Sequence, residues 1–277
     1  MQPVLTSSHR HARRTRRPWA FVVRDPAPED IDARVDWSAW YLTDEEDMGE
    51  SVEQTQINRT VRSSLEELAA SRGWTKVFWS SDNFFAWIRD EPMVRVSPDV
   101  YLLEDPPPPP HPRMWQTWLP GHKPPRWALE VVSDDWKKDY DEAPLKYAQL
   151  GARELVIFDP EIAASSERRG ARVPLQVYRR DADGAFLRIY AGDGPAPSEE
   201  LDAFLVVKRE RGAVRIRIAR DASGQDVVPT TEEAKQAAET RAQSEVEARR
   251  AAETRARTAE DQVRALEAEL RALRGET

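Results

Sequence analysis

Residues 127–132 read WALEVV, and this short apolar run with a single charge decides the fold class. Runs of this kind are typical of strands that are buried on both faces of a sheet. A helical pattern follows over 138–150, and residues 155–158 (LVIF) form a second apolar run. A strand, a helix and a strand in this order predict an α/β sheet with a right-handed crossover. We therefore expect an α/β fold, with a mixed sheet flanked by helices.

The helix over 138–150 contains Pro144, which is better tolerated in a first turn than in a helix interior. The helix should therefore begin near Ala143 or be kinked there, and Gly151 suits its C-cap. A longer amphipathic helix is expected over 52–71, with Gly73 as its C-cap. Its apolar stripe consists of Val52, Ile57, Val61, Leu65 and Leu68.

Further strands are expected on both sides of this central unit. Residues 76–87 predict a strand or a hairpin arm, and residues 93–103 predict a strand that runs through Asp99. Two hairpins are expected at 174–190 and 204–219, around Asp183-Gly184 and Arg211-Gly212. We assign residues 36–228 to one domain and residues 1–35, which are rich in Arg and Pro, to a disordered tail.

The segment 229–277 consists almost entirely of strong helix formers and predicts one long helix. Val263, Leu266, Leu270 and Leu273 follow one another at spacings of three, four and three, which is the seam of a coiled coil. Ala fills most earlier seam positions, so the seam is strongest near the end. We expect a coiled coil with a second copy or a partner helix; the alternative is a single solvated helix.

Composition excludes several classes of protein. The chain of 277 residues has no cysteine, which rules out disulfides, thiolate zinc sites and a cysteine nucleophile, and it has only four histidines. Its net charge is -8, although residues 1–24 carry six arginines and no acid, so the body is more acidic still. Any nucleic-acid chemistry must therefore be concentrated in a local site. No apolar stretch is long enough for a membrane helix, and we expect a cytoplasmic protein.

Two acidic residues interrupt the predicted apolar strands, where a carboxylate costs free energy unless something compensates for its desolvation. They are Asp99 and Glu130. If the strands are neighbours, both carboxylates reach one site, and two hard oxygen ligands favour Mg²⁺ or Mn²⁺ over zinc. Such a cation beside a phosphate would activate water and neutralise developing charge. The alternative is that Asp99 belongs to a turn after Pro98 and that Glu130 pairs with a lysine.

Four motifs in order carry a resemblance to a known family. They are SPDV at 97–100, LEVVS at 129–133, Asp139 before a helix ending in YAQLG at 147–151, and ELVIFDP at 154–160. Together they resemble the bacterial Uma-type restriction endonucleases of the PD-(D/E)XK nuclease superfamily, over roughly residues 37–210. The resemblance implies a restriction-endonuclease-like fold, a divalent metal and DNA as the substrate. The tail likewise resembles the coiled-coil extension of many such proteins.

The resemblance also implies roles for single residues. Asp99 matches the metal-binding aspartate of the central strand, and Glu130 matches the acid of the next strand. The lysine that stands two residues after that acid in the superfamily is replaced here by Val132. In the Uma-type group the lysine has usually moved to the following helix, four residues before the tyrosine that corresponds to Tyr147. That position here is Ala143, so the chain departs from the family pattern.

Three lysines are candidates to replace the missing one. Lys146 lies one turn beyond Ala143, and we assign it the catalytic role; Lys137 and Lys138 precede the helix and are alternatives. Each would orient the attacking water and stabilise the transition state. The alternative is that all three are solvated surface charges. Asp139 matches a family acid, or caps the helix.

The first helix of the family usually contributes an acid and often a histidine. Gln54 stands about where that histidine would be, and Glu50 and Glu53 are the available acids. We predict that Glu53 is a third metal ligand. The alternative is that both glutamates lie in a helix N-terminus, which favours acidic side chains without any function.

The tryptophans divide into two groups. Trp79, Trp87 and Trp127 lie in predicted strands and are expected in the core. Trp115, Trp118 and Trp136 lie in predicted loops near the proposed site and are candidates for stacking on bases.

The first functional hypothesis is a Mg²⁺-dependent endonuclease that hydrolyses DNA phosphodiester bonds through Asp99, Glu130 and Lys146. The second is an inactive relative, in which the nuclease fold is a binding or scaffold module that assembles through its tail. The departures at Ala143 and Gln54 motivate the second hypothesis. A purely structural coiled-coil adaptor is a third.

Overall fold

The structure is a computed structural model that describes residues 51–133, 136–165, 170–210 and 212–274. The tail expected over 1–35 therefore lies outside the described residues. The chain separates into two compact units, residues 1–228 and residues 229–277.

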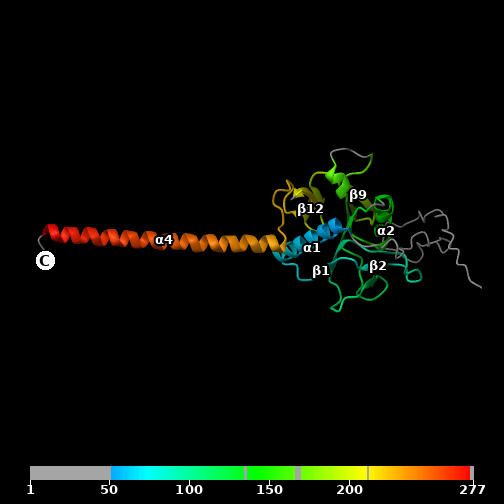
Figure 1. Ribbon diagram of the computed structural model, residues 1–277. Coiled ribbons are helices and arrows are strands. Elements are labelled where there is room, and N and C mark those ends of the chain that lie inside the picture. Colours follow the sequence, from blue (N-terminus) through cyan, green and yellow to red (C-terminus); the bar gives the residue numbers. More distant parts are fainter. Residues whose placement is uncertain (1–50, 134–135, 166–169, 211, 275–277) are drawn as a thin grey trace, which may run out of the picture. The chain divides into compact units, whose positions relative to one another are not determined.

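A six-stranded mixed sheet forms the centre of the first unit (Figure 1). Its strands, in spatial order, are β1 (Val77–Ser80), β4 (Val100–Glu104), β6 (Trp127–Val131), β7 (Glu154–Phe158), β8 (Leu175–Arg180) and β9 (Phe186–Gly192). Strands β6 and β7 are parallel, and the other neighbours are antiparallel. The predicted mixed α/β sheet is thus confirmed, including its parallel pair across the helical connection.

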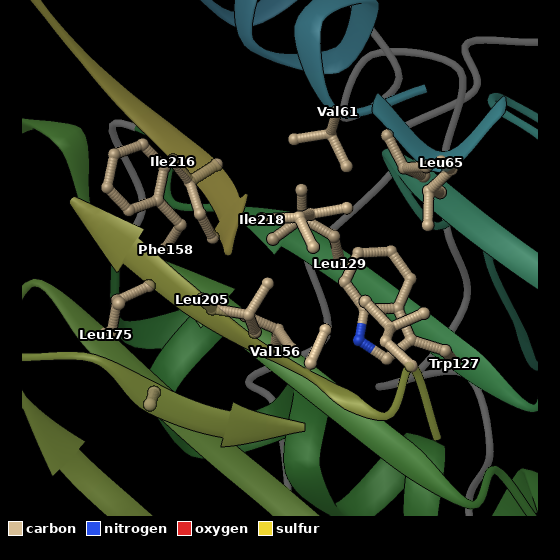
Figure 2. Close-up of a cluster of buried hydrophobic side chains, with 14 of the residues drawn as sticks. Val61, Leu65, Trp127, Leu129, Val156, Phe158, Leu175, Leu205, Ile216 and Ile218 are labelled. Atoms are coloured by element: carbon tan, nitrogen blue, oxygen red, sulfur yellow. The ribbon is translucent and has the colours of Figure 1, made fainter. Parts of the chain in front are cut away.

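One face of this sheet is covered by α1 (Val52–Arg72) and by a smaller antiparallel sheet. The smaller sheet consists of β10 (Ala196–Ser198), β11 (Ala203–Glu210) and β12 (Ala213–Ala219), and the short helix α3 (Pro160–Ala164) lies near β12. Figure 2 shows how Leu65 of α1, Leu129 and Val156 of the large sheet and Ile218 of β12 point into one apolar cluster. This cluster fixes α1 across the sheet.

Helix α1 has the boundaries that the sequence predicts. The Ser51 hydroxyl accepts a hydrogen bond from the Gln54 N–H at 3.1 Å, and Gly73 ends the helix in the left-handed region with φ 65°. The predicted apolar stripe is buried apart from Val52, which is 81% exposed. Val52 is the first residue of the helix, so it lies beyond the sheet that buries the rest of the stripe.

The opposite face of the large sheet carries a second apolar cluster. It is covered by α2 (Ala143–Leu150), by the π-helical turn η3 (Lys138–Glu142) and by a small sheet. The strands of that sheet are β3 (Arg95–Val96), β2 (Phe84–Ala86) and β5 (Met114–Gln116). The expected interruption at Ala143 is confirmed, because the π-helical turn gives way there to an α-helix that has Pro144 in its first turn. Gly151 caps α2 with φ 93°.

The strand expected over 93–103 is wrong in one respect. It is divided at residues 97–99, so that β3 and β4 belong to different sheets and Asp99 lies just before β4. Pro98 has no N–H to donate to a ladder, which explains the break. Residues 76–87 are divided in the same way into β1 and β2.

The two hairpins are confirmed as β8–β9 and β11–β12.

The second unit contains one described helix, α4 (Thr231–Arg274). No described helix is both long enough and apolar enough to cross a membrane.

The buried Glu154 at the start of β7 predicts a pH dependence of stability. Burial raises the pKa of Glu154 from 4.5 to about 7, although the Ser198 hydroxyl and the Glu199 N–H donate to its carboxylate. The folded state therefore holds this proton more tightly than the unfolded chain. The resulting stabilisation is complete below pH 4.5 and is lost as the pH rises through about 7. It amounts to about 3 kcal/mol.

Urea unfolding of Glu154→Gln at pH 5, 6, 7 and 8 should show a flatter pH profile than the wild type. Glu66→Gln, at an exposed position of α1, is the matched control and should keep the wild-type profile. Parallel profiles for wild type and Glu154→Gln would show that another group causes the dependence.

Candidate active site

The two acids singled out by the sequence lie at the same end of two neighbouring strands. Val100 of β4 is paired with Leu129 of β6; Asp99 precedes Val100 and Glu130 follows Leu129, so both acids lie beside the last pair of this antiparallel ladder. The Val131 N–H donates to Asp99 Oδ2 at 2.7 Å. The Asp99 side chain thus extends the ladder beyond the end of β4 and lies against the segment that carries Glu130.

Two amide side chains of α1 hold the other oxygen of Asp99. Gln54 Nε2 donates to Asp99 Oδ1 at 2.5 Å, and Asn58 Nδ2 donates to the same oxygen at 3.2 Å. Gln54 and Asn58 are four residues apart and therefore share one face of the helix. Asp99 is only 7% exposed, so these donors replace the water that its charge would otherwise have.

Glu130 is held from the other face of the sheet. The Tyr147 hydroxyl of α2 donates to Glu130 Oε1 at 2.6 Å. Burial raises the pKa of Glu130 well above its ordinary value, and the negative charge of Asp99 raises it further. The Tyr147 hydrogen bond and the positive charge of Lys138 act in the opposite direction. The two acids therefore repel each other electrostatically, and a cation between them would relieve that repulsion.

The structure places Glu53 away from this pair. Its carboxylate lies 3.7 Å from the Arg215 guanidinium of β12, and its side chain is exposed. Glu50 lies outside the described residues. Within the described ranges, no three His, Cys, Asp or Glu side chains are grouped so that they could hold a metal ion.

The three candidate lysines have different surroundings. The Lys146 ammonium lies 3.5 Å from Glu142 Oε2, and both side chains are buried. Lys137 is exposed, with its ammonium 5.8 Å from the centre of the Trp136 indole. Lys138 is the first residue of the π-helical turn, and its positive charge lowers the pKa of Glu130. Lys138 is thus linked to this pair of acids through the effect of its charge.

Comparison with known proteins identifies the family of this chain. A sequence model of the Uma2 family, described as "Putative restriction endonuclease", matches residues 46–203, which is more than half of the chain. The chain belongs to the Uma2 family. A solved structure from Anabaena variabilis, titled as a putative nuclease belonging to DUF820, is 11% identical with a TM-score of 0.38. That likeness covers 55% of this chain and 75% of the other. No curated protein matches.

The Uma2 match contains Asp99, Glu130 and Tyr147, and it leaves α4 outside. At the position of the Uma2-type helix lysine, Ala143 is buried in the cluster that also contains Tyr147. Because Ala143 and Tyr147 are four residues apart in α2, they share one helix face. A longer side chain at 143 would therefore project on the same side as the Tyr147 hydroxyl.

A second set of contacts ties the π-helical turn of this Uma2 member to the sheet. Asp139 Oδ2 accepts from the Ser133 N–H at 2.8 Å and from the Ser133 hydroxyl at 3.2 Å. Asp159 caps α3 and receives a bidentate pair of bonds from Arg172. The Tyr140 hydroxyl lies 2.9 Å from Asp159 Oδ2. Asp159 therefore both caps α3 and anchors η3.

Sequence reasoning missed Asn58 and placed two tryptophans in loops that are not there, because Trp136 lies in the helical segment that leads into η3 and Trp115 lies in a strand. An asparagine on the apolar side of a predicted helix was the available signal for Asn58. Trp115 is not in a loop: it lies in β5, is fully buried and donates to the Tyr101 hydroxyl at 3.1 Å, so it has no surface on which a base could stack. Trp118 and Trp136 are partly exposed.

Asn58→Ala should lower the free energy of unfolding by about 1–3 kcal/mol, because it removes a buried hydrogen bond to a carboxylate. Gln56→Ala, at an exposed position of the same helix, is the control and should have little effect. In an Asp99→Ala background the cost of Asn58→Ala should shrink. Additive costs in this double-mutant cycle, measured by urea unfolding, would show that Asn58 does not act on Asp99.

Proposed function

We propose that this protein is a divalent-metal-dependent nuclease that hydrolyses phosphodiester bonds in DNA, with Asp99 and Glu130 as its metal ligands. The observation that supports the proposal most directly is the position of the two acids, which lie beside the last pair of the β4–β6 ladder. The negative charge of Asp99 raises the pKa of Glu130, as expected for two neighbouring carboxylates. Membership of the Uma2 family supports the same reading.

The donor set fits Mg²⁺ or Mn²⁺. Both ligands are hard carboxylate oxygens, and Mg²⁺ is commonly held by one or two carboxylates together with waters and substrate phosphates. A third acid is therefore not required, which agrees with the ion pair between Glu53 and Arg215. When bound, the cation would activate a water and neutralise charge on the phosphate that is cleaved.

The surrounding residues would orient the ligands and stabilise charge. Gln54, Asn58 and the Val131 N–H fix the Asp99 carboxylate from two sides, and the Tyr147 hydroxyl fixes Glu130. We assign to Lys138 the electrostatic role first given to Lys146. The ammonium of Lys146 is engaged with the buried Glu142, whereas the charge of Lys138 acts on Glu130.

One observation favours a second function, a nuclease fold used for binding alone. The helix position where the family has a lysine is a buried alanine, Ala143. A protein without a lysine ammonium at this position would still hold a metal and DNA phosphates but would stabilise the transition state less. Metal binding without DNA cleavage would identify this second function.

The first test is the nicking of supercoiled plasmid in the presence of Mg²⁺ or Mn²⁺. Asp99→Ala and Glu130→Ala should each lower the rate by about 100-fold or more, because each removes a ligand of the charge-stabilising cation. Glu53→Ala is the matched control and should cleave as the wild type does. Equal rates for the wild type and both site variants would refute the assignment.

A second test concerns the lysine. Lys138→Ala should lower the nicking rate by about 10- to 100-fold, whereas Lys137→Ala should leave it nearly unchanged. Lys146→Ala should mainly lower the free energy of unfolding, because it leaves the buried Glu142 without its partner. Ala143→Lys should raise the rate by returning a cation to the helix face of Tyr147. A rate loss confined to Lys146→Ala, in a variant that still folds, would contradict our choice of Lys138.

A further inference from the structure

Helix α4 begins at a well-defined cap and continues for 44 residues. The Thr230 hydroxyl accepts from the Glu233 N–H at 3.2 Å, and Glu233 Oε2 accepts from the Thr230 N–H at 2.7 Å. This reciprocal pair is a capping box. A helix of this length spans about 66 Å.

Four large apolar side chains of α4 are exposed in the described part of the chain. Val246, Val263, Leu266 and Leu270 are each at least half exposed, and every residue over 235–271 is classed as exposed. Most helices in proteins owe their stability to the packing of an apolar face and not to helix propensity alone. A 44-residue helix with exposed valines and leucines is therefore expected to pack against another helix.

The apolar positions select a particular partner. Val263 and Leu266 occupy successive a and d positions of a heptad, and Leu270 and Leu273 repeat the pattern. A β-branched residue at a with leucine at d favours two-stranded coiled coils. Ala252, Ala256 and Ala259 extend the seam towards the N-terminus. It stops at Glu245 and Arg249, where charged side chains occupy the d and a positions.

The charges beside the seam fix the orientation. In a parallel pair aligned in register, each g residue faces the e residue that lies five positions later in the other helix. Arg255 then faces Glu260 of the second copy, and Glu269 faces Arg274 of the second copy, so both contacts are attractive. An antiparallel pair on the same seam would place Glu260 against Glu267 of the second copy, which is repulsive. Charge complementarity thus favours two copies of this chain, side by side and in register.

We propose that residues 252–274 form a parallel, in-register, two-stranded coiled coil between two copies of this protein. Because alanines fill three of the seven seam positions, the pair buries few large side chains, and its dissociation constant should be on the order of micromolar. Each assembled particle would then contain two copies of the Asp99–Glu130 pair. The pairing itself does not depend on the proposed nuclease activity.

The oligomeric state of the full-length chain tests this directly. Sedimentation equilibrium should show a monomer–dimer transition as the concentration rises from nanomolar to about 100 micromolar. The double variant Leu266→Ser and Leu270→Ser should stay monomeric, while Ala268→Ser, on the outer face, should dimerise as the wild type does. Glu269→Arg should weaken the dimer about tenfold or more, and adding Arg274→Glu should restore it. A monomer at all concentrations, or a dimer that survives the double serine variant, would overturn the proposal.

The absence of cysteine allows a clean test of orientation. Ala259→Cys puts a thiol at a d position, where two parallel, in-register helices bring it next to its own copy. Oxidation should then give rapid cross-linking, whereas Asp261→Cys on the outer face should cross-link slowly. Equal cross-linking of the two variants would exclude the parallel, in-register arrangement.

Discussion

The hydrogen bond from the Val131 N–H to the Asp99 carboxylate is the contact on which the proposed metal site depends. It lets a side chain continue a ladder that Pro98 would otherwise end, and so holds Asp99 opposite Glu130. The pairing register of β4 and β6 keeps this contact in place. A slip of one residue between β4 and β6 would turn every side chain of one strand to the other face, and the apolar clusters on both faces oppose such a slip.

The two acids are also tied to opposite layers of the molecule. Asp99 is bonded to α1, which packs on one face of the large sheet, and Glu130 is bonded to α2 on the other face. Both apolar clusters therefore help to position the two carboxylates of the proposed site. Repacking under either helix would change how the carboxylates face each other, even when no residue of the site is altered.

The sequence predicted well those parts of the fold in which burial is nearly complete. WALEVV and LVIF became adjacent parallel strands because few other arrangements bury such runs on both faces. The sequence did not predict contacts between residues that lie far apart in the chain. Trp115 followed a proline-rich stretch and resembled a loop residue, but β5 pairs with β2, thirty residues earlier. Asn58 and Asp99 are 41 residues apart in the sequence, and no local sequence pattern predicts the hydrogen bond between them.

The π-helical turn over Lys138–Glu142 has a consequence for reading related chains. Such a turn holds more residues than an α-helical one, so the helical phase shifts within it. Counting back by four from Tyr147 is valid inside α2 and reaches Ala143. Counting further upstream crosses the shift, so a spacing of three or four residues no longer identifies side chains on one helix face. The helical phase counted from Tyr147 therefore does not extend to Lys138, which lies within the π-helical turn.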